Sequence, residues 1–327
     1  MRVDRRSFVA GGLVAAAAAG RAVAQTSYPQ RAVRVIVPFP AGGTTDLLAR
    51  LVSERLQSYW GQPFVVENVG GAGGSLGADR VAKAAPDGYT LLFHNLTFST
   101  TSVSLEIAGR ATHDMFRDFR PVSLAAHVPM IVLGRASGPT GTLADFVTAA
   151  RQSSESALYG STGPGSVMNF AMEVFRRDSG LKLDHVPFRG AAPLLQELVA
   201  GRLHLGGDQL STSLEFIRSG AVRPLATLSN TRPTALPDVP TVRELGFPNM
   251  EMQGWNGFFA PAATPDDIVN KLEAGVKRAM QEPELRTRLL ALGADPIGST
   301  PAEFLAVLRR QVDGVRPLLA ELKLVVQ

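Results

Sequence analysis

The residues best suited to binding a ligand lie in the segment Pro38–Asp46, between a predicted strand and a predicted helix. Gly42 and Gly43 allow a tight turn and leave backbone N–H groups uncovered. Thr44 and Thr45 are predicted to be N-cap residues of the helix. An anion at such a helix start gains roughly 0.3–2 kcal/mol. We therefore predict a carboxylate-binding loop, although an ordinary strand-to-helix turn has a similar sequence.

Three later segments repeat this chemistry. Residues 70–75 and 161–166 are glycine-rich and each precedes an apolar helical pattern. Arg189 opens another predicted helix, and its guanidinium can bind a carboxylate through two hydrogen bonds. Asp46 could bind a cation or an amine, or it could cap its own loop.

The sequence supports a nucleotide-binding or catalytic role of these loops less well than carboxylate binding. Phosphate-binding loops end in Gly-Lys-Ser or Gly-Lys-Thr, and no glycine loop here supplies the lysine. Residues 73–77 match the nucleophile-elbow pattern with Ser75 as nucleophile, and His185 or His204 would have to complete the site. The chain has no cysteine, and its five histidines lack metalloprotease spacing. We expect no metal and no cofactor.

Two α/β halves position these loops. Strands are predicted at residues 33–37, 64–68 and 89–95, and the first two each precede a glycine loop and a helix. The apolar runs of these strands are continuous rather than alternating. Both features predict a parallel sheet covered on both faces. Residues 119–134 are extended and would carry the chain into a second half with the same alternation. Glycine loops at the carboxyl ends of strands in both halves would face a cleft.

The C-terminal part of the chain predicts three helices. The first is expected to begin with Thr264 as N-cap and Pro265 at the first helical position. The last opens at Thr300 and has the capping-box spacing to Glu303.

The first 24 residues predict an export signal. Arg5 and Arg6 precede a short apolar stretch, and Ala22–Ala24 has small-x-small cleavage spacing. The paired arginines indicate the twin-arginine export route, and the general route remains an alternative. This segment carries four arginines and one aspartate, so the net charge of +4 falls to about +1 without it. No basic run remains in the rest of the chain, which argues against nucleic acid or anionic membrane as a partner.

Seven motifs follow one another through the mature chain: Pro38–Asp46, Glu67–Gly74, Ala84–Leu91, Gly160–Gly163, Pro187–Ala192, Leu236–Thr241 and Trp255–Pro261. In these motifs the chain resembles the exported substrate-binding proteins of tripartite tricarboxylate transporters, also called Bug receptors. The resemblance implies a periplasmic protein of two α/β lobes, the type II periplasmic-binding-protein fold with mainly parallel sheets. Lobe 1 would comprise residues 25–125 and 229–327, and lobe 2 residues 126–228.

The same resemblance implies a function without catalysis. Such receptors close like a hinge on a small organic acid, which could be a di- or tricarboxylate, an acidic amino acid or an aromatic carboxylate, and they pass it to a membrane transporter or sensor. We expect a monomer. Carried over, the ligand-binding residues are Phe39, Ala41, Gly43, Thr44, Thr45 and Asp46 from one lobe and Ser161, Thr162, Arg189, Gly190, Ala191 and Asp208 from the other.

Three positions depart from the family pattern. Phe188 stands where tyrosine is usual, which removes a hydroxyl near the expected site and could alter ligand choice. His204 replaces a common aspartate, and Val315 falls where tryptophan is usual; both changes are expected to affect packing. The alternative function is an exported serine hydrolase that uses Ser75.

Overall fold

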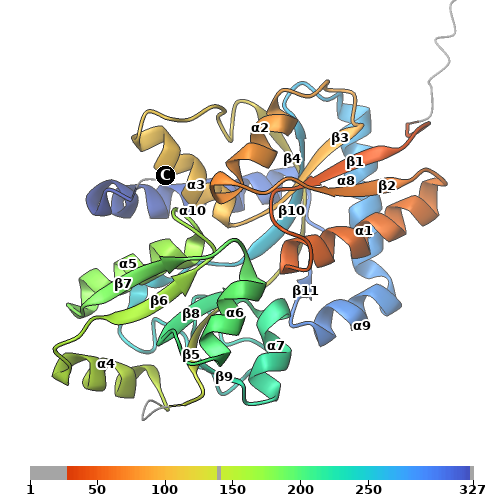
Figure 1. The fold of residues 1–327 in the computed structure, drawn as a ribbon. Helices are drawn as coiled ribbons and strands as arrows, with labels where there is room; N and C mark the ends of the chain where they lie inside the picture. The colour runs from red at the N-terminus through yellow and green to blue at the C-terminus, as the bar shows by residue number, and fades with distance from the viewer. Residues whose placement is uncertain (1–27, 138–140, 325–327) are drawn as a thin grey trace, which may run out of the picture. The chain divides into compact units, whose positions relative to one another are not determined.

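The structure, a computed structural model, describes residues 28–137 and 141–324, so the predicted export signal lies outside the described residues. The account below concerns the compact unit that begins at Arg31. This unit contains two β-sheets flanked by helices (Figure 1). We call the part built on the first sheet lobe 1 and the part built on the second sheet lobe 2.

Lobe 1 has a sheet with the strand order β11-β4-β10-β3-β1-β2. Strand β1 pairs in parallel with β2 and β3, whereas β10 runs antiparallel to β3 and β4. Four of the five β1 residues are buried, which accounts for its continuous apolar sequence. The strands are β1 (Val33–Val37), β2 (Phe64–Asn68), β3 (Thr90–Asn95), β4 (Phe119–His127), β10 (Trp255–Pro261) and β11 (Asp295–Pro296).

Helices follow the parallel strands of lobe 1 and also form its C-terminal part. They are α1 (Thr44–Trp60), the 3₁₀ turn η1 (Ala72–Gly74), α2 (Ser75–Ala82), α3 (Thr97–Ile107), α8 (Asp266–Gln281), α9 (Pro283–Ala291) and α10 (Pro301–Leu322). The capping box predicted between Thr300 and Glu303 is present at the start of α10. The N-cap predicted at Thr264 is wrong: α8 begins at Asp266 after Pro265, because the Thr264 hydroxyl donates to the Pro261 carbonyl instead.

Lobe 2 has a sheet with the strand order β7-β6-β8-β5-β9. Its strands are β5 (Met130–Arg135), β6 (Ala157–Ser161), β7 (Leu183–Pro187), β8 (Leu205–Gln209) and β9 (Val222–Thr227). Its helices are α4 (Leu143–Gln152), α5 (Val167–Ser179), α6 (Ala191–Val199) and α7 (Leu210–Arg218). Strand β6 is parallel to β7 and β8, whereas β5 is antiparallel to β8 and β9.

Both sheets are therefore mixed rather than mainly parallel. The expected two-lobed α/β fold is confirmed, and the parallel part of each sheet comes from the repeated strand–loop–helix units. The antiparallel strands β4, β5, β9 and β10 flank the segments that lead from one sheet to the other, and the sequence pattern did not specify their direction.

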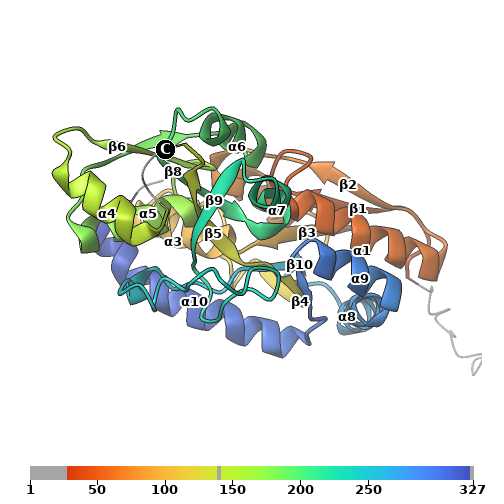
Figure 2. The same cartoon turned by 90° about the horizontal axis from the view of Figure 1, so that it is seen from below.

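The chain passes between the sheets twice, after β4 and after β9 (Figure 2). The two passages are hydrogen-bonded to each other. The Val128 amide of the first passage donates to the Gly254 carbonyl of the second over 3.1 Å, and the Met252 amide donates to the Leu228 carbonyl over 2.7 Å within the second passage. The second passage contains the short turn η2 (Pro248–Met250). These paired segments connect the two sheets. The lobe boundaries after residues 125 and 228 stay a prediction.

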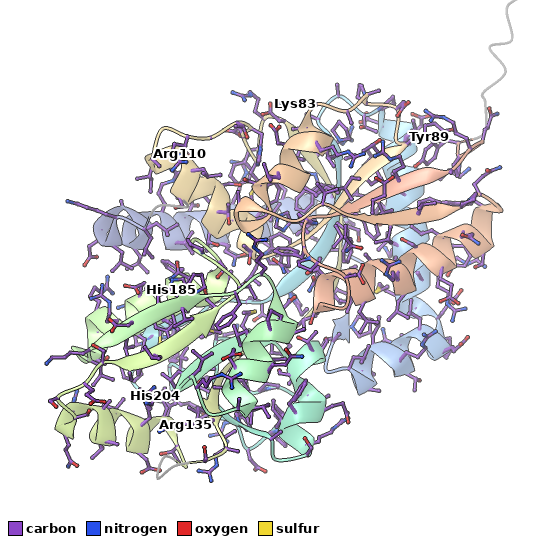
Figure 3. All side chains as sticks on the ribbon, in the orientation of Figure 1. Lys83, Tyr89, Arg110, Arg135, His185 and His204 are labelled. Carbon is purple, nitrogen blue, oxygen red and sulfur yellow. The ribbon has the colours of Figure 1, made fainter. Side chains whose placement is uncertain are left out.

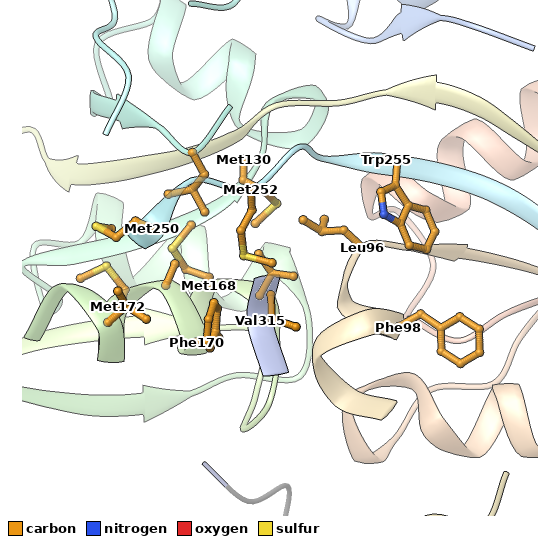
Figure 4. Close-up of a cluster of buried hydrophobic side chains, with 14 of the residues drawn as sticks. Leu96, Phe98, Met130, Met168, Phe170, Met172, Met250, Met252, Trp255 and Val315 are labelled. Atoms are coloured by element: carbon orange, nitrogen blue, oxygen red, sulfur yellow. The ribbon is translucent and has the colours of Figure 1, made fainter. Parts of the chain in front are cut away.

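A methionine-rich core lies beside these passages. Figure 4 shows its labelled side chains Met130, Met168, Met172, Met250 and Met252 together with aromatic and aliphatic neighbours. Each of these methionines is less than a tenth exposed. Unbranched thioether side chains fill irregular spaces, which suits a core shared by elements of both sheets. Among the described helices, none combines the length and the hydropathy needed to cross a membrane.

Candidate functional site

A small cavity of about 80 Å³ is lined by residues of both lobes. Its walls come from the loop after β1 and the start of α1, from the end of β3 and the start of α3, from the start of α6 and from the end of β8. It is lined by Phe39, Pro40, Ala41, Gly43, Thr44, Thr45, Asn95, Thr97, Met130, Thr162, Val167, Met168, Arg189, Gly190, Ala191, Ala192, Pro193, Asp208 and Gln209.

The lobe 1 wall exposes the amino end of α1. The predicted N-caps Thr44 and Thr45 are wrong: the N-cap is Gly43, and no side chain caps the helix. The Thr45 hydroxyl instead accepts a hydrogen bond of 2.9 Å from the Asn95 side chain, and the Thr44 hydroxyl lies 3.3 Å from that of Thr212. Because neither threonine caps the helix, the N–H groups of its first turn stay available to a ligand.

The lobe 2 wall presents a second helix start. The N-cap of α6 is Gly190, at φ +106°, again with no side-chain cap. Ala191 and Ala192 follow and add only methyl groups to the wall. One uncapped helix amino end from each lobe therefore lines the same cavity. Each end favours an anion by roughly 0.3–2 kcal/mol.

The carboxylate of Asp46 holds the α1 loop in place. It accepts a 3.0 Å hydrogen bond from the Gly42 amide, a 3.0 Å bond from Arg50 Nε and a 2.9 Å bond from Asn68 Nδ2. Asn68 Nδ2 also donates to the Phe39 carbonyl over 3.0 Å. Burial raises the pKa of Asp46, but these hydrogen bonds outweigh it, and the pKa lies below its ordinary value. Asp46 is therefore a charged loop cap.

Two of the predicted ligand-binding residues, Asp46 and Ser161, do not line the cavity. The oxygens of Asp46 are already bonded within lobe 1, as described above. Ser161 is fully buried, accepts a 3.2 Å hydrogen bond from the Gly163 amide and lies 2.7 Å from His185 Nε2. Both side chains support a loop from behind and do not face the cavity.

The other ten predicted residues do line the cavity, and their role in binding remains a proposal. Arg189 is exposed at its rim. Asp208 is buried, and burial raises the pKa of its carboxyl to about 6, although the Thr212 hydroxyl and the Gln209 amide donate hydrogen bonds to it. The cavity therefore combines uncapped amides and a cation with one weakly acidic carboxyl.

Sequence reasoning missed several polar lining residues. Asn95 is the last residue of β3 and Gln209 the last residue of β8, and a position at a strand end was the available signal. Gln209 Nε2 is buried and has no hydrogen-bond partner among the described residues. Thr97 begins α3, a helix that no periodic pattern indicated.

A second cavity of about 510 Å³ adjoins the first. It lies between the glycine loop of residues 70–74 and the lobe 2 segments 162–164 and 187–190. Phe188 lines it, so the hydroxyl that tyrosine would carry is missing here. His204 lies elsewhere and accepts a 3.0 Å hydrogen bond from the Leu158 amide. The three predicted glycine loops thus all line this pair of cavities.

The two lobes contact each other directly around the cavities. The Thr100 hydroxyl of α3 donates to the Gly165 carbonyl of lobe 2 over 2.9 Å. A methyl group placed on Gly190 would lie 3.3 Å from the Pro40 ring of lobe 1. The lobes are therefore close enough to enclose a small ligand.

Ser75 lacks the partners that the hydrolase alternative requires. Of the candidate bases, His185 contacts Ser161 and His204 contacts Leu158, both in lobe 2 (Figure 3). His94 adjoins Gly74, but burial lowers the pKa of this imidazole to about 3, so it is a poor base. Within the described residues, no group of three acids and histidines is arranged to hold a metal.

Known proteins share this architecture over nearly the whole chain. The family profile described as tripartite tricarboxylate transporter family receptor matches residues 48–324. Protein BugT of Bordetella pertussis is 32% identical over 327 residues, covering 99% of this chain and 100% of BugT. A protein of R. palustris solved with adipate is 33% identical with a TM-score of 0.84, covering 90% of this chain and 98% of that one. MatC of Rhodopseudomonas palustris, solved with malate, is 35% identical with a TM-score of 0.82, covering 89% and 100%.

Replacing Asp46 with alanine should destabilise the protein by about 1–3 kcal/mol, because the Gly42 amide and the Asn68 side chain lose a buried acceptor. Urea unfolding measures the change. Asp267→Ala is the control, since Asp267 is an exposed aspartate in the first turn of α8. Affinity for plain carboxylates and for amino acids should fall equally; a selective loss of amino acids would show that Asp46 contacts the ligand.

Replacing Gly190 with alanine should weaken ligand binding at least tenfold, because the methyl group meets Pro40 across the cavity. Gly180→Ala is the control: Gly180 also has positive φ, +68°, but open space lies around its Cβ position. Both variants should lose stability from backbone strain, and only Gly190→Ala should lose affinity by calorimetry. Equal affinity in the two variants would contradict the proposed approach of the lobes.

Proposed function

The chain belongs to the tripartite tricarboxylate transporter receptor family, the Bug-type periplasmic solute-binding proteins, and we propose that it captures a small organic carboxylate in the cavity between its lobes. The observation that carries the proposal is the meeting of two uncapped helix amino ends, α1 and α6, at one cavity. Relatives solved with adipate and with malate support the same ligand class.

The cavity chemistry suggests what else the ligand carries. A water needs roughly 10–15 Å³, so a cavity of about 80 Å³ suits a compact acid. The amides of α1 and α6, together with Arg189, supply donors for carboxylate oxygens. Asp208 supplies an acceptor, which fits a hydroxyl or ammonium group on the ligand.

Capture would proceed by hinge closure. The two hydrogen-bonded passages between the sheets would flex, and lobe contacts such as Thr100 with Gly165 would form as the ligand is enclosed. We propose that the chain is exported through the twin-arginine route, acts as a monomer without catalysis, and delivers its ligand to a tripartite tricarboxylate-type transporter or a sensor.

A thermal-shift screen tests the function directly. Ligands at about 100 times their dissociation constant should add roughly 2.7 kcal/mol and raise the melting temperature. The panel should contain malate, adipate, citrate, glutamate and benzoate, with neutral sugars as the control. A shift confined to carboxylates is the expected result.

A flat response to every carboxylate would count against the proposal once the protein is shown to be ligand-free. Native mass spectrometry before and after mild unfolding provides that check, because a co-purified acid would be released. Ester hydrolysis that disappears in Ser75→Ala would instead revive the hydrolase alternative.

The acidity of Asp208 predicts a pH dependence of binding. Above pH 6 its carboxyl is charged and repels a second negative group, so affinity for plain dicarboxylates should fall by about tenfold between pH 5 and pH 8. Affinity for ligands whose ammonium faces Asp208 should rise over the same range. Calorimetry at five pH values measures both profiles.

Two variants complete this experiment. Asp208→Asn should flatten both profiles, whereas Asp184→Asn, at an exposed position of lobe 2, should leave them unchanged. The pKa of Asp208 is raised in the folded state, so the unfolded protein loses this proton at lower pH than the folded protein does. The free energy of unfolding therefore falls as the pH rises from about 4 to above 6. Asp208→Asn should therefore stabilise the ligand-free protein at pH 7.5 by about 2–3 kcal/mol. Unchanged profiles in Asp208→Asn would remove Asp208 from the site.

A further inference from the structure

The hydroxyl of Thr212 supports the lobe 2 wall of the small cavity without lining it. Thr212 lies in the first turn of α7 and donates a hydrogen bond to the carboxylate of Asp208, which does line the cavity. The Gln209 carbonyl lies 3.0 Å from the same hydroxyl oxygen and is a competing acceptor. A hydroxyl has a single proton, and a charged carboxylate accepts more strongly than a carbonyl, so the proton goes to Asp208.

The oxygen of the same hydroxyl contacts lobe 1. Helices α1 and α7 lie side by side in both views of the fold (Figures 1 and 2). Thr44 Oγ1, on the first residue of α1, lies 3.3 Å from Thr212 Oγ1. Because the Thr212 proton is used by Asp208, the buried Thr44 hydroxyl is the donor of this bond and the Thr212 oxygen is its acceptor. Two consecutive hydrogen bonds therefore connect Thr44 of lobe 1 through Thr212 to Asp208 of lobe 2.

This connection differs from the other threonine contacts around the cavities. Thr45, the next residue along α1, bonds within lobe 1, so its contact does not depend on the position of lobe 2. Thr100 does reach lobe 2, but its acceptor is a backbone carbonyl that does not line the small cavity. Only while the lobes are together can Thr44 reach its acceptor, and both ends of the connection, Thr44 and Asp208, line the cavity. The connection is therefore placed where a bound ligand meets both lobes.

We propose that Thr212 is a positioning residue for ligand capture, a latch that orients Asp208 in the lobe 2 wall and accepts the Thr44 hydroxyl when the lobes close. The inference rests on the proposed capture of a carboxylate between the lobes. A ligand enters before the latch forms, and it can leave only after the latch has broken. The latch therefore slows ligand release and leaves the association rate nearly unchanged.

Stopped-flow measurement of malate binding tests the latch. Thr212→Val keeps the branched side chain and removes the hydroxyl, so it should raise the dissociation rate about three- to tenfold, while the association rate stays within about twofold. Thr212→Ser keeps the hydroxyl and should release malate as wild type does. Thr148→Val is the matched control, because the exposed Thr148 hydroxyl donates to the Ala144 carbonyl, 2.9 Å away in its own helix of lobe 2. An unchanged dissociation rate in Thr212→Val, or an effect confined to association, would overturn the proposal.

A double-mutant cycle separates the bond between the lobes from the orientation of Asp208. Thr44→Val removes the donor and leaves the bond from Thr212 to Asp208 in place. If the two hydroxyls bond to each other, the variant that carries both Thr44→Val and Thr212→Val should release malate more slowly than the product of the two single effects requires. Single effects that simply multiply would show that the two threonines act separately, which would contradict the latch.

Lobe separation in the ligand-free protein provides a readout that needs no ligand. The chain has no cysteine, so Gln57→Cys on α1 and Gln196→Cys on α6 introduce one spin-label site at an exposed position of each lobe. In pulsed electron paramagnetic resonance, the fraction of molecules with the shorter separation should fall by at least half in Thr212→Val and recover in Thr212→Ser. If malate and the other acids fail to bind wild-type protein, the proposed ligand class is wrong, and these distances still test the latch. Identical distance distributions in wild type and both variants would overturn it.

Discussion

The site depends on the charged carboxylate of Asp46. The first-turn N–H groups of a helix can bind a ligand only if no side chain of the protein caps them. The loop before such a helix must then be ordered by other hydrogen bonds. Asp46 meets both needs, because it accepts from Gly42 in the loop and not from the first turn of α1. Arg50 and Asn68 neutralise and orient it, and Asn68 also fixes the Phe39 carbonyl. The loop is thereby ordered with its first-turn amides still open.

The opposite wall follows the same principle with different residues. Gly190 caps α6 without a side chain, and Ser161 with His185 stabilises the neighbouring loop from behind. Small residues then permit the lobes to approach, as the short distance from Gly190 to the Pro40 ring illustrates. At Gly190 and Ala191 the lobe 2 wall consists of main chain and one methyl group, which leaves room for Pro40 of lobe 1 to approach.

Local sequence patterns predicted the repeated strand–loop–helix units. They did not predict the elements whose structure or direction depends on tertiary contacts. The strand–loop–helix unit of β1 and α1 and the capping box at Thr300 were predictable, because each depends on a few neighbouring residues. Helix α3 was not predicted because its sequence is rich in threonine and serine, which have modest helix propensity. Burial of most of its residues stabilises the helix instead. Its Thr100 forms one of the contacts between lobes. The mixed direction of the sheets depends on long-range pairing that no local pattern encodes.

Part of the site came from the family resemblance and not from spacing. Nothing in the local pattern would bring Arg189 and Asp208 to the same cavity as Gly43, because they lie more than 140 residues away along the chain. Asn95 and Gln209 were overlooked because strand-end position alone does not distinguish a lining residue from a structural one.

A wall made of backbone amides has an evolutionary consequence. Point mutations replace side chains and leave the peptide groups of α1 and α6 in place, so the attraction for an anion survives most sequence drift. Side chains that line the cavities, such as Phe188 in the larger one and Asp208 in the smaller one, can then change without removing the backbone amides. Gene duplicates built on this scaffold would diverge in what they transport through a few substitutions, without first losing the capacity to bind an acid.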